Sequence, residues 1–375
     1  MNARSSDPLP PALREESCRL ADSWMRHDQA WLRDYLVQGV EDPRRNVQSI
    51  LTRHFLAERL IGIDEGWARL MDHELRFALA VNWLETLAEE AIGPEETSWI
   101  RYGLEHSAGE VEGVVIPEYV LDTAERLRSR PRGPGGLPIP DYLSKLLDAA
   151  ERGRGRIPQE APERSLFLDL WRRALAALPP PQSRPLTLEP GCGSANDYRA
   201  IAACGLAERM DYLGLDICEK NVANAKALCP EARFETGNAL ELPVADGACE
   251  LAFAHDLFEH LSPAALERAV KELCRVVRGG LCLGFFKMHE EPDHVVRRVE
   301  DYHWNTLSAD RIRKAFEECG FETQVVHIDT FLRAVYGCAD THNKDAYTLF
   351  CRRKAASSGT NTLSSETRKG ENQQR

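Results

Sequence analysis

One short segment constrains the fold of this chain more than any other part of its sequence. In residues 186–196 an apolar run ends in Glu189, and Gly191 and Gly193 follow directly. This pattern predicts a buried strand that breaks into a tight loop before a helix. Because glycine lacks a Cβ, it tolerates positive φ and lets backbone N–H groups approach a bound molecule closely. The segment therefore predicts a ligand site at the end of a strand.

A second acid follows at the end of the next apolar run. Asp216 comes directly after residues 212–215, and a carboxylate at the end of a parallel strand can accept both hydroxyls of a ribose. A loop for a dinucleotide would favour a third glycine where Asn196 stands. The two acids and two glycines together indicate a cofactor that carries a nucleoside.

Strand-like runs alternate with helical patterns from Leu186 onward. This alternation predicts an α/β fold with parallel strands and helices on both faces of one sheet, and ligands then bind at the carboxyl ends of the strands. Both Glu189 and Asp216 stand at such ends. Strands are expected near residues 186–190, 211–216, 232–236, 249–254, 280–286, 321–328 and 346–352.

The segments beyond Asp216 follow one another in a recognisable order. They are Arg233–Ala239, Leu242–Pro243, Cys249–Phe253, Glu259–Leu261 and Arg275–Gly280. This succession resembles the class I S-adenosylmethionine-dependent methyltransferases over residues 165–352, in particular the branch that acts on small molecules. The resemblance implies a Rossmann-like, seven-stranded sheet whose last strand is antiparallel. It also implies S-adenosyl-L-methionine as the cofactor and a small-molecule acceptor, with N, O, S and C all open as the accepting atom.

The resemblance assigns four residues to the methionine and ribose portions of the cofactor. Gly191 and Gly193 would line these portions, and Glu189 would orient the amino end through the loop. Asp216 would bind the ribose hydroxyls. A simple helix N-cap is the alternative role for Asp216.

Three further residues would bind the cofactor. Ile217 would pack on the face of its adenine ring, and Asn238, with Ala239 beside it, would accept a hydrogen bond from the adenine amino group in place of the usual aspartate. A turn residue is the alternative role for Asn238. The chain departs from the family pattern at Ala195, where a glycine is usual, and at Arg278, where a proline is usual.

Candidates for the acceptor side follow the fourth and fifth strands. A base is needed only if the accepting atom holds a proton that must leave. His303 and His255 are the candidate bases because imidazole titrates near neutral pH, and a packed interior position is the alternative for His303. The candidates for substrate contact are Asp256, Tyr302 and Trp304, whereas Glu259 and His260 are open between local scaffolding and a substrate-side role.

The first third of the chain carries helical patterns. Residues 12–129 contain apolar residues at helical spacing, including a stripe from Trp67 to Trp83 that must be buried. Breaks rich in proline and glycine separate this part from the sheet. We expect a disordered N-terminus at 1–11, an all-helical domain at 12–152 that caps the site or forms a homodimer, a linker at 153–164, the methyltransferase domain at 165–354 and a disordered tail at 355–375.

Composition argues against several classes of partner. The formal net charge of −12 disfavours nucleic acid, because such binding depends on Lys and Arg. No run approaches the roughly 18 apolar residues of a membrane span and no secretory signal is present, so no membrane partner is expected and the cytoplasm is the expected compartment.

Cysteine usage gives no strong sign of a metal site. The 11 cysteines include no Cys-x-x-Cys pair, and we expect them to be small buried hydrophobic residues. The spacing of Cys338 and His342 leaves a metal half-site open beside a plain polar loop.

Two other functions remain open beside the leading one. The chain could methylate protein side chains, with its helical part as a docking surface. It could also be a non-catalytic binding protein that kept the fold. The joint presence of the two acids and two glycines argues against this second alternative.

Overall fold

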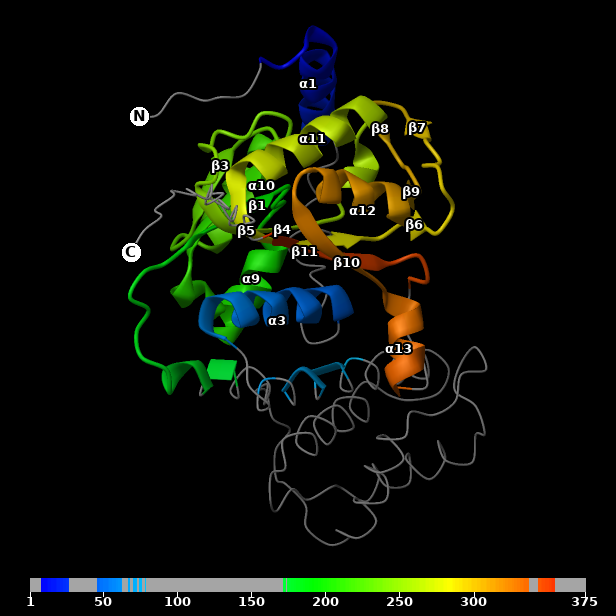
Figure 1. The fold of residues 1–375 in the computed structure, drawn as a ribbon. Helices are drawn as coiled ribbons and strands as arrows, with labels where there is room; N and C mark the ends of the chain where they lie inside the picture. Colours follow the sequence, from blue (N-terminus) through cyan, green and yellow to red (C-terminus); the bar gives the residue numbers. More distant parts are fainter. Residues whose placement is uncertain are drawn as a thin grey trace, which may run out of the picture.

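The computed structural model describes residues 8–26, 46–62, 174–336 and 343–354, with Trp67, Leu70–Asp72, Glu74, Leu75, Ala78, Trp171 and Arg172 between them. Within these residues, helices cover both faces of a central sheet (Figure 1). The predicted linker at 153–164, the tail from residue 355, Cys338, His342 and most of the predicted helical region lie outside the described residues.

The sheet confirms the expected fold class. Its strands lie in the order β10-β11-β5-β4-β1-β2-β3. The strands β1 to β5 pair with one another in parallel. In contrast, β11 is antiparallel to both of its neighbours, β5 and β10. The last strand in the sequence is therefore the reversed one, as the family resemblance implies. The strands are β1 (Leu186–Pro190), β2 (Asp211–Asp216), β3 (Arg233–Thr236), β4 (Cys249–His255), β5 (Val277–Phe285), β10 (Phe321–His327) and β11 (Tyr347–Arg353).

The helices of the described residues connect these strands or precede them. They are α1 (Pro11–Arg26), α3 (Val47–Ile61), α9 (Asn196–Cys204), α10 (Glu219–Leu228), α11 (Pro263–Val276), α12 (Ala309–Glu318) and α13 (Ile328–Tyr336). Shorter elements are the 3-10 turns η3 (Leu206–Arg209) and η4 (Phe258–His260) and the strands β6 (Met288–His289), β7 (Arg298–Val299), β8 (Tyr302–His303) and β9 (Leu307–Ser308). Ser308 caps α12 by accepting a hydrogen bond from the N–H of Arg311.

The main difference from the expected strand bounds lies at the start of β5. This strand begins at Val277 because the residue after α11 is already extended, so helix passes into strand without a loop. Gly279 permits this path, since a Cβ there would meet the carbonyl oxygen of Glu250 at 2.4 Å. Arg278, at the position where the family has proline, pairs with Glu250 at 2.7 Å.

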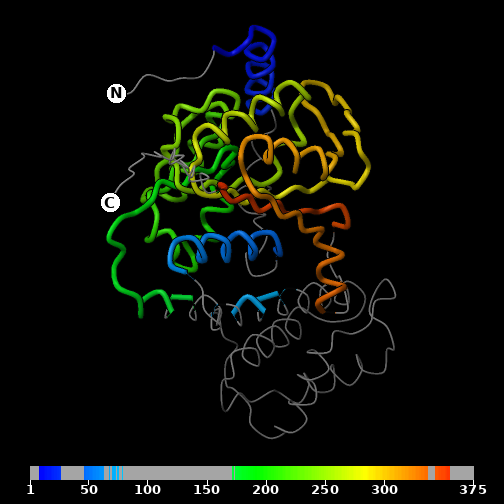
Figure 2. The backbone as a smooth tube through the Cα atoms, in the orientation of Figure 1, coloured from blue at the N-terminus to red at the C-terminus, as the bar shows by residue number. Residues whose placement is uncertain are grey.

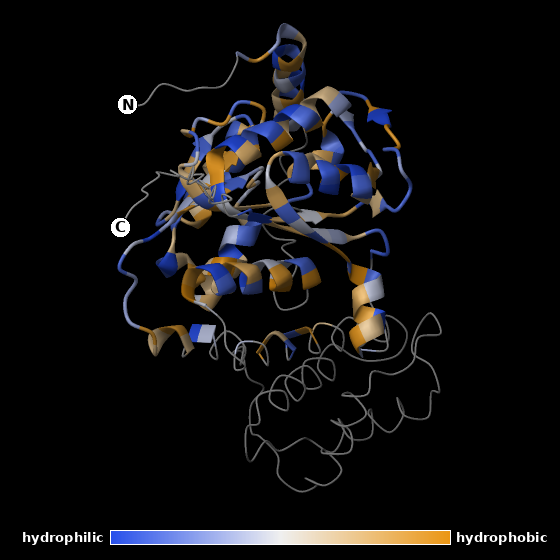
Figure 3. Cartoon of the chain, in the orientation of Figure 1, coloured by the Kyte–Doolittle hydropathy of each residue, from blue (hydrophilic) through white to orange (hydrophobic). Residues whose placement is uncertain are grey.

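Two apolar cores hold the helices on the sheet. Phe55 of α3 and Ile201 of α9 pack with Phe253 on one face. On the other face Leu273 of α11 and Phe316 of α12 share a core with the strands. Figure 2 shows α3 beside α9 although the two helices are far apart in the sequence, and Figure 3 shows that the visible side of α12 is mostly hydrophilic.

The described helices of the N-terminal part belong to these cores. Leu9, in the segment predicted to be disordered, is 4% exposed because it packs with Leu13 of α1 against the domain. In the apolar stripe, Trp67 contacts the ring of Trp171 at 4.9 Å, and Leu75 packs against α3. These two residues of the stripe therefore pack within the chain, Leu75 buried and Trp67 partly buried.

Candidate functional site

The loop after β1 has the backbone geometry that glycine allows. The φ angle is +75° at Gly191 and +51° at Gly193. Ala195 also has a positive φ of +70°, which accounts for the glycine usual at that position. The N–H groups of Gly191 and Cys192 both donate to the carbonyl of Leu215, at 2.7 and 3.0 Å. The loop is therefore tied to the end of β2.

Asp216 holds the same loop through its carboxylate. Its Oδ2 accepts from the N–H of Gly193 at 2.9 Å, and its Oδ1 accepts from the N–H of Cys218 at 2.8 Å and from the side chain of Asn221 at 3.2 Å. Burial raises the pKa of Asp216 above its ordinary value, although these hydrogen bonds act in the opposite direction. Cys218 is the N-cap of α10, so the N-cap alternative for Asp216 is wrong. A carboxylate has about four acceptor sites, and three donors leave room for one more.

Carboxylates are concentrated around this loop. Glu189, at the end of β1, is 2% exposed and accepts a hydrogen bond from the hydroxyl of Tyr212. Burial raises the pKa of Glu189 well above its ordinary value, and the nearby Asp197 and Asp216 raise it further. A positively charged group bound here would relieve this repulsion.

His255, a predicted base, has a neighbour at each ring nitrogen. Its Nδ1 lies 3.2 Å from Oδ1 of Asp197, and its Nε2 lies 2.8 Å from Oγ1 of Thr52 in α3. Burial disfavours the charged form of His255, but the carboxylate of Asp197 outweighs burial and raises the pKa. The structure thus gives His255 a linking position between α3, α9 and β4.

Asn238 lies in a turn, and both ends of its side chain are engaged. Its Oδ1 accepts from the N–H of Leu240 at 2.9 Å, and its Nδ2 donates to Oγ of Ser17 in α1 at 2.9 Å. Asn238 thus serves as a turn residue, and because its amide oxygen has a second lone pair, the contact with adenine stays a prediction. Ile217 and Ala239 are half-buried, and Ile217 packs against the core.

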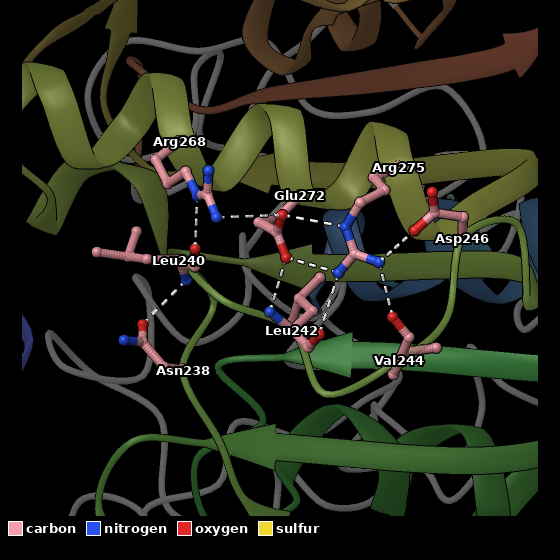
Figure 4. Close-up of polar contacts among 8 residues, drawn as sticks. All are labelled: Asn238, Leu240, Leu242, Val244, Asp246, Arg268, Glu272 and Arg275. Carbon is pink, nitrogen blue, oxygen red and sulfur yellow. Dashed lines mark hydrogen bonds and ion pairs between the residues drawn. The ribbon is translucent and has the colours of Figure 1, made fainter. Parts of the chain in front are cut away.

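A buried ion pair fixes the backbone that follows Asn238 (Figure 4). Glu272 of α11 pairs with Arg275 at 2.7 Å and accepts from the N–H of Leu242 at 2.9 Å. Arg275 in turn donates to the carbonyls of Leu242 and Val244 at 3.1 and 2.8 Å. The sequence analysis missed this pair, although the charges three residues apart on a helix were a usable signal.

Helix α1 lies against the same edge of the sheet, which the sequence did not predict. Besides the Ser17 contact, the carboxylate of Glu16 accepts from the N–H of Ser262 at 2.9 Å and from its hydroxyl at 2.6 Å. The sulfur of Met25 lies 3.8 Å from that of Cys218. These contacts place α1 across segments that follow β2, β3 and β4.

Aromatic rings gather beyond β4 and β5. The ring centroid of His260 lies 5.9 Å from that of Tyr302 and 5.4 Å from that of Trp304. The ring of Phe286 lies 4.8 Å from that of Trp304. Trp304 is 38% exposed, so one side of the group is open to solvent. The structure therefore brings the predicted Tyr302 and Trp304 together and adds His260 to them.

Two other predicted acceptor-side residues, Asp256 and His303, differ in exposure. Asp256 is exposed and has a positive φ of +52°. His303 is half-buried, and burial lowers its pKa below the ordinary value although Glu16 acts in the opposite direction. A neutral imidazole can accept a proton, so His303 is better suited to act as a base than His255.

Glu259 has the scaffolding role that the sequence left open. It is fully buried, and its Oε1 accepts from the N–H of Phe286 at 2.8 Å. Burial, assisted by Asp256, raises the pKa of Glu259 to about 8. The carboxyl group is therefore protonated at neutral pH and joins the ends of β4 and β5.

Most of the cysteines that the structure describes are packed inside the domain. Eight of the ten cysteines that the structure describes are buried, as the sequence predicts. Among the described residues there is no cluster of His, Cys, Asp and Glu able to hold a metal ion. None of the helices in the described ranges is long and apolar enough to cross a membrane.

The part of the chain that holds this site matches a known protein family. A family model described as a methyltransferase domain matches residues 188–283, which run from β1 to β5 and include the glycine loop and Asp216. Residues 188–283 form a methyltransferase domain. The match confirms the resemblance seen in the sequence, and S-adenosylmethionine is the cofactor of that class.

Individual proteins are similar to parts of the chain. A probable S-adenosylmethionine-dependent methyltransferase from Mycolicibacterium smegmatis is 30% identical over 143 residues, which cover 36% of this chain and 52% of the relative. The chain thus spans about half the length of the curated relative that it matches. The solved YcgJ protein of Bacillus subtilis has a TM-score of 0.35 at 15% identity and matches 50% of this chain and 98% of that one. A solved S-adenosylmethionine-dependent methyltransferase from Mesorhizobium loti has a TM-score of 0.36 at 17% identity. The match covers 50% of this chain and 100% of that one. The assignment of the methyltransferase domain rests on the two sequence matches.

Proposed function

We propose that the chain binds S-adenosylmethionine at the carboxyl ends of β1 and β2 and transfers its methyl group to a small-molecule acceptor. The observation that carries this proposal is the bond between Asp216 and Gly193, which holds a loop of positive-φ glycines beside a buried carboxylate. At such an edge a ligand can reach both the backbone N–H groups of the loop and a carboxylate that accepts hydrogen bonds from ribose hydroxyls.

The residues present fit this cofactor in space and in charge. A Cβ added at Gly193 would meet no atom within 4 Å, so there is open room next to the loop. The carboxyl groups of Glu189, Asp197 and Asp216 lie close enough to raise the pKa of Glu189, and a bound ligand that carries an ammonium and a sulfonium group would favour their ionised forms. When bound, the cofactor supplies a methyl group that is activated by the positive charge on sulfur.

The chain's own contribution would be orientation and exclusion of water. The loop and Asp216 would fix one reactant, and the tilted rings of His260, Tyr302 and Trp304 would offer an aromatic surface to the other. Positioning of this kind can supply most of the rate enhancement for an in-line transfer. Where the acceptor holds a proton, His303 would take it on a ring nitrogen, because its lowered pKa keeps the imidazole neutral.

Transfer of a labelled methyl group tests the proposal. The full chain would be incubated with S-adenosylmethionine labelled in the methyl group and a cell extract separated into small molecules and proteins. We expect label in the small-molecule fraction, with Asp216→Ala as the matched control that lowers it. Label in the protein fraction alone would show that the acceptor is a protein and not a small molecule. Label in neither fraction would contradict the transferase activity.

A further inference from the structure

Two cysteines meet at the opposite edge of the sheet from the proposed cofactor site. Cys274 lies in the last turn of α11, and Cys319 is the C-cap of α12. Their thiols are hydrogen-bonded to each other. Cys274 is 8% exposed and Cys319 is more open, so one thiol of the pair can be reached from solvent.

Arg353, at the end of β11, binds the backbone of both cysteines. Its Nη1 donates to the carbonyl of Cys319 at 2.7 Å, and its Nη2 donates to the carbonyl of Cys274 at 2.6 Å. The same guanidinium lies over the ring of Phe321, 3.9 Å from its centroid. One rigid cation therefore holds the ends of the two helices together and keeps the thiols in contact.

The charges around the pair favour one thiolate. The hydrogen bond from Cys274 lowers the pKa of Cys319 to about 7, and Arg353 and Lys271 act in the same direction, whereas burial and Glu318 oppose them. The pKa of Cys274 is raised, because its proton is shared with Cys319 and its site is buried. A thiolate next to a protonated thiol is a usual arrangement for the attacking and resolving members of a reactive pair.

We propose that Cys274 and Cys319 are a redox-reactive pair that forms a reversible disulfide with two-electron oxidants such as hydrogen peroxide. This inference does not depend on the proposed methyl transfer, because both residues lie away from that site. It uses two thiols that contact each other where α11 and α12 end.

The reaction balances with peroxide as the oxidant. The thiolate of Cys319 attacks one peroxide oxygen and breaks the O–O bond, which gives a sulfenic acid and releases hydroxide; this hydroxide takes up the proton that the Cys319 thiol gave to the solvent on ionising, and the first water forms. The sulfur of Cys274 then attacks the sulfur of Cys319. The S–O bond breaks, the departing hydroxide takes the proton of Cys274, and a second water leaves. Two thiols are oxidised to one disulfide, and one peroxide is reduced to two waters.

Peptide mapping of the full chain tests the pairing. The reduced protein would be treated with stoichiometric peroxide at pH 7, blocked with N-ethylmaleimide, digested and analysed by mass spectrometry. We expect one pair of peptides joined through Cys274 and Cys319, which dithiothreitol separates. Cys18→Ser, which removes an exposed cysteine of α1, should leave this product unchanged. Oxidation of Cys319 without the joined peptides, or a product that uses another pair, would overturn the proposal.

Alkylation rates give a second test that needs no variant. We expect iodoacetamide to modify Cys319 faster than the more exposed Cys18 at pH 7, with a rate that rises through a midpoint near 7. In the variants Arg353→Gln and Cys274→Ser, the midpoint of the alkylation rate of Cys319 should move to a higher pH. A slower reaction at Cys319 than at Cys18 in the wild-type chain would contradict the proposal even if both variants failed to fold.

Discussion

The side chain of Asp216 accepts a hydrogen bond from the backbone N–H of Gly193 at 2.9 Å. Through this bond the end of β2 sets the shape of the loop that leaves β1, and a single carboxylate thereby serves both the loop and the proposed ribose site. Loss of this side chain should therefore affect ligand binding in two ways, by removing an acceptor and by loosening the loop.

Asp216→Ala is expected to weaken binding of S-adenosylmethionine about ten- to a hundredfold, because charge-assisted hydrogen bonds contribute roughly 1.5–3 kcal/mol. Calorimetric titration would give the affinity, and circular dichroism would show that the variant is folded. Asp216→Asn keeps the shape of the side chain but loses its charge, so its affinity should lie between those of the wild type and Asp216→Ala. An unchanged affinity in folded Asp216→Ala would rule out the ribose assignment.

Gly191→Val should destabilise the fold more than Gly193→Ala. At Gly191 the φ of +75° strains any branched residue, and a Cβ would meet the side chain of Leu257 at 3.2 Å. At Gly193 the space is open, so the cost is mainly that of the left-handed conformation, about 1–2 kcal/mol. Urea unfolding of both variants gives the comparison. Equal losses, or the reverse order, would be inconsistent with this loop geometry.

Glu272→Ala should lower the free energy of unfolding by about 3–5 kcal/mol, because it leaves the buried charge of Arg275 without its main partner. Asp246→Ala is the matched control. Asp246 also pairs with Arg275 at 2.7 Å, but its side chain is 49% exposed, and such pairs contribute about 1 kcal/mol or less. Similar losses in both variants, measured by urea unfolding, would show that the buried carboxylate does not hold the turn after Asn238.

Glu259 should make stability depend on pH. Its folded pKa of about 8 lies above the ordinary value of 4.5, so between these values the unfolded chain has released a proton that the native chain keeps. The contribution of protonated Glu259 to the free energy of unfolding is therefore complete below pH 4.5 and is lost as the pH rises towards 8. Glu259→Gln, which imitates the protonated carboxyl, should flatten this part of the profile. An identical slope in wild type and variant, from unfolding curves across this range, would refute the assignment.

Much of the sheet could be predicted from the sequence because its strands are buried apolar runs that end at turn residues. The glycine loop and Asp216 were predictable for the same reason, since their chemistry is local to two strand ends. The start of β5 was not, because α11 passes directly into the strand at Val277 and leaves no turn signal between them.

Contacts between distant segments could not be predicted in this way. Thr52 meets His255, and Ser17 meets Asn238, only because α3 and α1 settle on particular parts of the domain. An amphipathic helical pattern shows which face of a helix is buried, but it does not name the surface that covers it. The Thr52 contact gives His255 a linking position between distant elements, and the Ser17 contact ties the turn at Asn238 to α1.

Calorimetric titration of the full chain with S-adenosylhomocysteine tests the central claim most directly, because it measures the cofactor site without knowledge of the acceptor. The account predicts saturable binding at one site per chain, and a marked loss of affinity in Gly191→Val and in Asp216→Ala. Absence of binding to the folded wild-type chain, or binding that neither variant weakens, would contradict the placement of the cofactor at the ends of β1 and β2.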